Sequence, residues 1–274
     1  QITLATKEIK AEINEHLQMA FDEETISADL ETELKDVFKE YQQEIIASSN
    51  KKTNIRLIDA ISKGLRESME RYDNLVIMGQ DVAEYGGVFK ITEGFTEQFG
   101  RERVRNTPIC ESAIVAAAYG AVLNGMKAVM EMQFADFVSS GFNPIVNLLA
   151  KSNYRWNQNA DVVVRMPCGA GVGAGPFHSQ TNEAWFTKTP GLKVVYPAFP
   201  EDAKGLLCAA INDPNPVLFF EHKALYRSIY QEVSDDYFTV ELGKASLLKE
   251  GNDVTIISYG AGVHWALDTL KTHT

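Results

Sequence analysis

The chain has 274 residues, of which 45% are hydrophobic and 23% are charged, a balance that excludes wholesale disorder and low-complexity classes. Its net charge is −11, from 26 Lys and Arg against 37 Asp and Glu, which argues against nucleic acid or an anionic membrane as the main partner. The longest uncharged apolar stretch, residues 113–123, is too short to span a membrane. Three widely spaced cysteines without a CxxC pair indicate free thiols in a reducing compartment.

Residues 1–50 are acidic and are expected to be mainly helical. They hold 4 Lys and no Arg against 12 Asp and Glu. Apolar residues recur at helical spacing in two stripes within residues 7–46. A small polar segment at 48–54, without apolar periodicity, is interpreted as a linker.

From residue 55 onwards, helical and strand patterns alternate. Helices are predicted around 55–69, 112–123, 143–154 and 201–212, and strands at 75–78, 128–133, 161–166, 193–196 and 217–221. The strands are apolar on both faces, which is typical of a parallel sheet covered by helices. We therefore predict an α/β fold, a doubly wound parallel sheet over 51–222. An irregular connection over 223–242 and the start of a second α/β domain over 243–274, with a strand at 253–259, are expected to follow.

Most familiar site motifs are missing from the sequence. It has no GxxxxGK[ST] loop, no HExxH pattern and no paired-cysteine metal pattern. The glycine loop at 169–175 follows a predicted strand, but Pro167 and Pro176 bracket it and no long helix follows, so it is a weak dinucleotide fingerprint. We expect instead that its backbone approaches a ligand closely, beside the polar run at 177–180.

Glu111 opens a predicted helix that is rich in Ala and Gly. One interpretation is a carboxylate stabilised by the positive end of the helix dipole. The other is a functional carboxylate, because a helix of small residues packs closely and would bury its first turn, where a charge is costly without a partner. The residues alone leave both interpretations open.

Six runs of residues resemble the beta subunit of branched-chain 2-oxo acid dehydrogenases, the decarboxylating component that uses thiamine diphosphate; pyruvate dehydrogenase beta is a close cousin. The runs are NTPICESA, AVMEMQFADF, GAGPFHSQTNEAWF, TPGLKVVYP, EDAKGLLCAAI and DPNPVLFFE, and the resemblance covers roughly residues 54–274. It implies a transketolase-like, pyrimidine-binding domain. Residues 1–47 resemble the last helix of the family's alpha subunit plus an extension, and the chain starts without Met. We therefore expect the middle portion of a natural alpha–beta fusion.

The resemblance implies a site for thiamine diphosphate. Glu111 matches the glutamate that binds the pyrimidine ring nitrogen and activates the cofactor. Ile109, Gln133 and Phe137 match positions that line the pyrimidine, although Phe137 replaces a tyrosine common in branched-chain members. His178 matches the histidine near the thiazolium, implied to assist proton transfer or to bind the substrate or lipoyl group. The alternative for His178 is a loop histidine satisfied by its neighbours.

Two metal ions are implied as well. Asp213 and Asn215 match positions that hold a structural potassium ion in some members, with backbone oxygens near Val162, Ala210 and Ile211. Ala210 replaces the family's cysteine there. The GDG motif that anchors magnesium and the diphosphate is not in this sequence, because in the family it lies in the alpha half.

The implied function is enzymatic, as a 2-oxo acid dehydrogenase component that decarboxylates a branched-chain 2-oxo acid and transfers the acyl group to a lipoyl-acyltransferase. Its implied partners are an alpha-type half of the same polypeptide, a second copy in a homo-oligomer, and the lipoyl-acyltransferase, with no nucleic acid and no membrane. We expect a cytoplasmic location and no activity from this chain alone. The alternatives are a pyruvate or acetoin dehydrogenase component, or a noncatalytic scaffold that retains the fold.

Overall fold

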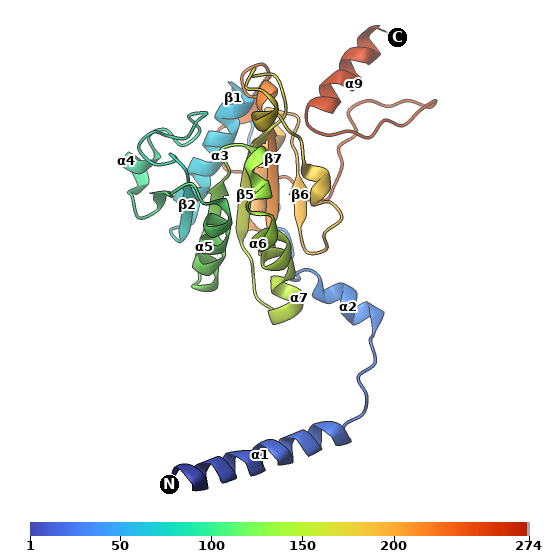
Figure 1. The fold of residues 1–274 in the computed structure, drawn as a ribbon. Coiled ribbons are helices and arrows are strands. Elements are labelled where there is room, and N and C mark those ends of the chain that lie inside the picture. Colours follow the sequence, from blue (N-terminus) through green and yellow to red (C-terminus); the bar gives the residue numbers. More distant parts are fainter. Residues whose placement is uncertain (273–274) are drawn as a thin grey trace. The chain divides into compact units, whose positions relative to one another are not determined.

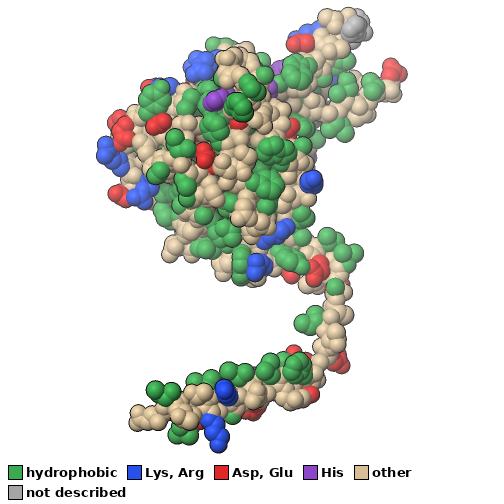
Figure 2. Space-filling model, viewed as in Figure 1, with side chains coloured by type: hydrophobic (Ala, Val, Ile, Leu, Met, Phe, Trp, Pro, Cys, Tyr) green, Lys and Arg blue, Asp and Glu red, His purple; other side chains and the backbone are tan. Residues whose placement is uncertain are grey.

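The computed structural model describes residues 1–272 and divides the chain into two units, Gln1–Lys35 and Asp36–Thr274. Residues 273–274, the end of the expected second α/β domain, lie outside the described residues. The first unit holds α1 (Ile2–Asp22) and most of α2 (Leu30–Asp36). Every residue of α1 is exposed within the chain, including the apolar stripe that Figure 2 shows along the helix. Among the described residues, no helix combines the length and the apolar character that crossing a membrane requires.

The second unit is built on a parallel sheet of six strands in the order β3-β2-β4-β5-β7-β6. The strands are β2 (Leu75–Gly79), β3 (Val104–Asn106), β4 (Lys127–Glu131), β5 (Val162–Cys168), β6 (Lys193–Val195) and β7 (Val217–His222). All residues of β2, β5 and β7 are buried, because helices cover both faces. The predicted α/β fold with a doubly wound parallel sheet is confirmed.

Helices on the two faces of this sheet form two separate cores (Figure 1). On one face lie α5 (Glu111–Leu123), α6 (Phe142–Asn147), η2 (Leu149–Lys151) and α7 (Ser152–Trp156); on the other lie α3 (Leu57–Arg71) and α8 (Pro200–Asn212). Successive strand residues alternate between the cores, as with Val163 toward α3 and α8 and Val164 toward α5. The single helix expected at 143–154 is divided into three short pieces. The small helix α4 (Phe95–Phe99) precedes β3.

Two strands arise where the sequence pattern predicted none. β1 (Lys52–Arg56) pairs antiparallel with β8 (Tyr230–Ser234), although the first was interpreted as linker and the second as irregular connection. The pattern failed because β1 is mostly polar and exposed, with no alternation to mark it. Conversely, the strand predicted at 253–259 is wrong, since these residues have no strand conformation and are exposed. Helix α9 (Ala261–Thr272) follows them, close to the helix expected after that strand.

Residues 36–49, here called the strap, begin the second unit. Beyond the end of α2 they have neither helix nor strand conformation, but they are hydrogen-bonded to the rest of that unit. The Lys39 N–H donates to Oδ1 of Asn215 (2.7 Å), and Nδ2 of Asn215 donates to the Lys39 carbonyl (3.0 Å). The Ile46 N–H donates to Oγ1 of Thr239 (2.8 Å). The second predicted helix therefore ends early, at the close of α2, because the following backbone groups bond to the domain instead of to one another. The division between the units accordingly falls after residue 35, whereas we expected a boundary at residue 50.

Candidate active site

The carboxyl ends of β2, β4, β5 and β7 meet at one edge of the sheet, which is where doubly wound sheets bind ligands. Four connecting segments leave that edge: a turn at 80–81, the short helix η1 (Ala135–Ser139), the glycine loop at 169–175, and the short helix η5 (Lys223–Leu225). The glycine loop leads into η3 (Pro176–His178), and η4 (Glu183–Trp185) comes next. The sequence-predicted residues Gln133, Phe137 and His178 all lie on these segments.

Glu111 and Gln133 are linked through one turn. Glu111 is the first residue of α5, and its Oε1 accepts a hydrogen bond from Nε2 of Gln80 (3.2 Å). Gln133 donates from its Nε2 to Oδ2 of Asp81 (3.3 Å), in the same turn after β2. Asp81 has φ +58°, an unusual value that fixes the direction of this turn. Two residues predicted to contact one cofactor ring are thus hydrogen-bonded to the side chains of two consecutive residues, 80 and 81.

The face of α5 beside Glu111 is not covered within this chain. Ile109 is 83% exposed, Cys110 is exposed, and Glu111 is half-buried rather than buried as the small-residue pattern suggested. The small residues pack closely on one side only: Val115 is buried, whereas Ala116 is exposed. The expectation of a buried carboxylate is therefore wrong for this chain by itself.

Phe137 and His178 lie in one aromatic cluster. Their ring centroids are 5.5 Å apart, and both pack edge-on against Phe134, at 5.7 Å and 4.6 Å. Asp136 fastens the two segments together, because its Oδ1 accepts the N–H groups of Ser179 (3.1 Å) and of the next residue (3.2 Å). Phe134 is not among the residues that the sequence predicted for the site. The structure adds it to the site, with Asp136 as the residue that holds the cluster in place.

A buried charge network lies behind this cluster. Arg165 on β5 donates to Glu131 on β4 (2.7 Å) and to both carboxylate oxygens of Glu221 on β7 (2.7 Å each). Burial raises the pKa of Glu131. Tyr226 donates its O–H to Glu221 (2.6 Å), and the Phe89 ring, 5.2 Å from that of Tyr226 and 5.6 Å from that of Phe134, joins the network to the aromatic cluster. The signal that could have found it is an ionisable residue within each of three strands that are otherwise largely apolar.

The side chains of the expected potassium site already have partners. Oδ2 of Asp213 accepts from the Lys193 ammonium (2.5 Å), and its Oδ1 accepts from both the backbone N–H and Nδ2 of Asn215 (2.9 Å each). Asn215 is also bonded to the strap through Lys39. A cation bound here would therefore need backbone carbonyls.

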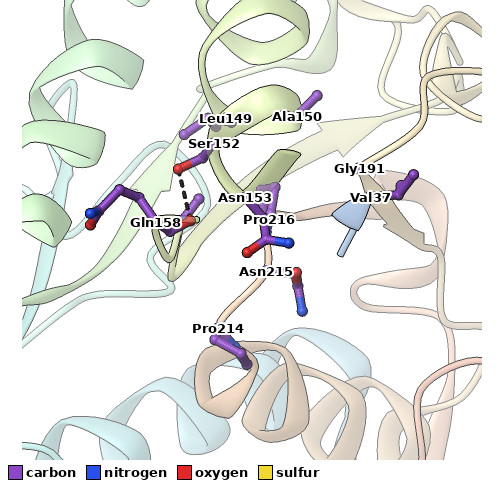
Figure 3. A pocket seen from close by; sticks show the side chains of 11 residues that line it. Val37, Leu149, Ala150, Ser152, Asn153, Gln158, Gly191, Pro214, Asn215 and Pro216 are labelled. Carbon is purple, nitrogen blue, oxygen red and sulfur yellow. Dashed lines mark hydrogen bonds between the residues drawn. The ribbon is translucent and has the colours of Figure 1, made fainter. Parts of the chain in front are cut away.

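Two such carbonyls are available at the end of α8. The carbonyl of Ala210 lacks its helical donor because residue 214 is a proline, and that of Ile211 lacks one because the N–H of Asn215 bonds to Asp213. Figure 3 shows a small pocket just beyond the end of α8, which Pro214 and Asn215 line together with Asn153; Ala210 and Ile211 are not among its lining residues. Within residues 1–272, no group of three or more His, Cys, Asp or Glu side chains could hold a metal ion.

Comparison with known proteins identifies the family. Residues 53–228 match the pyrimidine-binding domain of transketolase. The chain is 50% identical over 216 residues to the 2-oxoisovalerate dehydrogenase subunit beta of Bacillus subtilis (strain 168), covering 78% of this chain and 66% of the relative. It is 44% identical over 215 residues to the pyruvate dehydrogenase E1 component subunit beta of the same organism, covering 77% and 66%.

More distant relatives agree. The mitochondrial 2-oxoisovalerate dehydrogenase subunit beta of Dictyostelium discoideum is 42% identical over 229 residues, covering 82% of this chain and 62% of the relative. A solved structure described as a split gene transketolase, inactive beta4 tetramer, superposes with a TM-score of 0.62 at 25% identity, covering 80% of this chain and 67% of that one. The chain spans slightly less than two thirds of the length of these curated relatives. The chain belongs to the transketolase pyrimidine-binding domain family, on the branch of the 2-oxo acid dehydrogenase E1 beta subunits.

Proposed function

We propose that this chain is the beta-type part of a 2-oxo acid dehydrogenase decarboxylating component, and that it supplies the pyrimidine half of a thiamine diphosphate site. Membership of the family implies that cofactor. The observation that carries the proposal is the pair of hydrogen bonds that ties Glu111 and Gln133 to residues 80 and 81 at the carboxyl edge of the sheet.

The residues present fit the pyrimidine part of the cofactor. Gln80 uses one carboxylate oxygen of Glu111, which leaves the other to accept a hydrogen bond from a protonated ring nitrogen. Ile109, largely exposed, offers an apolar wall beside it, and Gln133 and Phe137 offer an amide and a ring. When bound, thiamine diphosphate supplies the carbon nucleophile that attacks a 2-oxo acid. Glu111 holds a proton on the pyrimidine nitrogen, and the uncovered face of α5 suits a second protein surface that excludes water.

His178 is proposed to transfer a proton or to bind the substrate or lipoyl group. Its ring is held edge-on against Phe134 and Phe137, so its direction is fixed while the residue stays half-exposed. A fixed and accessible imidazole suits either role better than a mobile surface histidine would.

The proposed substrate is a branched-chain 2-oxo acid, because the identity to the 2-oxoisovalerate relative is higher than to the pyruvate relative, 50% against 44%. The proposed partners are an alpha-type half that binds magnesium and the diphosphate, a second copy of this chain, and a lipoyl-acyltransferase. Without the alpha-type half, the chain is proposed to be inactive. A cytoplasmic location stays a prediction.

Potassium is proposed to bind the free carbonyls of Ala210 and Ile211, near Val162, with the C-terminal end of α8 adding negative potential. Melting curves in potassium chloride and in sodium chloride at equal ionic strength test this directly. A higher melting temperature in potassium alone is expected, and equal melting temperatures would contradict it.

The test of the function is Glu111→Gln in the enzyme assembled with its alpha-type half. Glutamine keeps the volume but cannot keep the pyrimidine nitrogen protonated, so turnover should fall by roughly 10²-fold or more. Exchange of the thiazolium carbon proton of bound cofactor for deuterium should slow in parallel, while the melting temperature changes little. Glu102→Gln, at an exposed carboxylate, is the matched control. Wild-type exchange in Glu111→Gln would show that Glu111 is only a helix-end carboxylate.

A further inference from the structure

Lys223 is a buried cation whose ammonium has no hydrogen-bond partner among the described residues. The residue is 4% exposed, and among the described residues no group hydrogen-bonds its Nζ. Burial lowers the pKa of Lys223. Buried lysines are rare in proteins and are normally paired. Lys204 illustrates the usual case, because its buried ammonium donates to Glu67 and to two backbone carbonyls, each at 2.8 Å.

The ammonium of Lys223 lies beside the aromatic cluster of the candidate site. Its Nζ is 5.4 Å from the centroid of the Phe134 ring, and the centroid of the His178 ring is 4.6 Å from that of Phe134. Asp136, which fastens the His178 segment, attracts the ammonium electrostatically, and its Oδ2 is likewise buried without a partner. Two buried polar atoms of opposite charge thus remain unsatisfied next to the proposed reaction site.

The glycine loop at 169–175 lies on both chain neighbours of Lys223. A Cβ at Gly169 would come within 2.3 Å of the His222 ring, and a Cβ at Gly171 within 2.9 Å of Cβ of Ala224. Both glycines also have positive φ, so each position favours glycine for its backbone conformation as well as for the lack of space for a Cβ. The loop residues 170–175 are exposed on their other side. A loop of this composition separates the ammonium from solvent and can shift without breaking side-chain contacts.

We propose that Lys223 binds the carboxylate of the 2-oxo acid substrate, reached when the glycine loop shifts away from His222 and Ala224. The inference rests on the proposed function, since a 2-oxo acid must enter this site. It explains why the described residues offer the ammonium no hydrogen-bond acceptor: the substrate carboxylate supplies one. A monoanion is favoured over the diphosphate because that group is expected in the alpha-type half. The carboxylate on Lys223 would place the 2-oxo acid beside Phe134, the ring that also contacts His178.

The experiment is Lys223→Met in the enzyme assembled with its alpha-type half, with two monoanionic probes that cannot be decarboxylated. Methyl isobutyrylphosphonate mimics 2-oxoisovalerate, and methyl acetylphosphonate mimics pyruvate. Loss of a charge-assisted hydrogen bond should raise the Kd of the better probe by about 10- to 100-fold in calorimetric titration. KM for the 2-oxo acid should rise by a similar factor. The Kd of thiamine diphosphate should stay within about threefold, and Lys223→Arg should restore part of the probe affinity.

Lys204→Met is the matched control, because it removes a buried ammonium that has all its partners. It should lower the melting temperature and leave the probe Kd unchanged, whereas Lys223→Met, which loses no hydrogen bond, should keep or raise the melting temperature. Unchanged probe affinity in Lys223→Met would overturn the inference while cofactor binding upholds the proposed function. If the wild-type assembly does not bind thiamine diphosphate, both fall. Lys223→Gln replaces the methionine variant if that variant does not fold.

Discussion

Replacing Arg165 by methionine should be among the most damaging changes to this fold. Arg165 is fully buried, and its guanidinium makes three hydrogen bonds of 2.7 Å to Glu131 and Glu221. Methionine fills much of the same volume but leaves two buried carboxylates whose only other hydrogen-bond donor, within residues 1–272, is the Tyr226 hydroxyl. The perturbation is therefore electrostatic rather than steric.

The expected loss follows from that arrangement. Removing one partner of a buried ion pair typically costs about 3–5 kcal/mol, and here one guanidinium serves two carboxylates, so the upper part of that range applies. A domain of ordinary stability has about 5–15 kcal/mol in total, so the variant should be near its unfolding threshold. Because burial already raises the pKa of Glu131, protonation of this carboxyl should relieve part of the loss at acidic pH.

The assay is urea unfolding followed by circular dichroism at pH 7 and pH 5, with two comparison proteins. Arg101→Met breaks an exposed pair with Glu84 and should cost at most about 1 kcal/mol. The triple variant with Glu131→Gln and Glu221→Gln removes the unpaired charges and should recover much of the loss. A decrease below about 1 kcal/mol in Arg165→Met, or no recovery in the triple variant, would refute the reasoning.

Three further predictions concern buried positions. Gly191→Ala should lower the free energy of unfolding in urea by at least about 2 kcal/mol, because φ is +92° and the new Cβ would lie 1.9 Å from the Ala150 carbonyl oxygen. The control is Gly100→Ala, which has a similar φ of +81° but open space around the new Cβ, and which should cost only about 1 kcal/mol. Tyr226→Phe should cost about 1–3 kcal/mol, because it removes the 2.6 Å hydrogen bond to buried Glu221; a neutral result would mean that Arg165 alone satisfies that carboxylate. Burial lowers the pKa of His222 below 6.5, so its contribution to stability is present above pH 6.5 and is lost as pH falls. Between pH 7 and pH 5 the melting temperature of His222→Gln should therefore fall less steeply than that of the unmodified chain. Equal slopes for the two proteins would contradict this.

The sheet could be predicted because its strands are apolar on both faces. Strands such as β5 and β7 each begin with a run of consecutive hydrophobic residues, 162–164 and 217–220, and such a run can be recognised without knowing which segments lie next to it in the fold. β1 could not be predicted, because its residues are polar and only the distant β8 makes it a strand. The run at 253–259 shows the converse: its apolar pattern suits a strand, but none of the described residues pairs with it.

The residues of the candidate site also divide into those that the sequence could propose and those that it could not. Glu111, Gln133 and His178 could be proposed from the sequence because each lies within a long motif shared with the family. Phe134 and Lys223 could not be assigned a site role from the sequence, because a phenylalanine beside a strand usually packs in the core and an isolated lysine is usually on the surface. Their relation appears only when the carboxyl ends of β4 and β7 are brought to one edge.

The bonds that hold the strap divide between its peptide groups and a few of its side chains. Asn215 bonds to the backbone of Lys39 and Thr239 to that of Ile46 and Glu44. Tyr41, Gln43 and Glu44 also bond to the domain through their side chains. Mutations should therefore be tolerated least at these three side chains and at their backbone-binding counterparts, Asn215 and Thr239. Proline is unfavourable at residue 39 as well, since it removes the N–H that Asn215 accepts. Over evolutionary time the strap should keep these few positions while the sequence between them changes, and its path along the domain should stay the same.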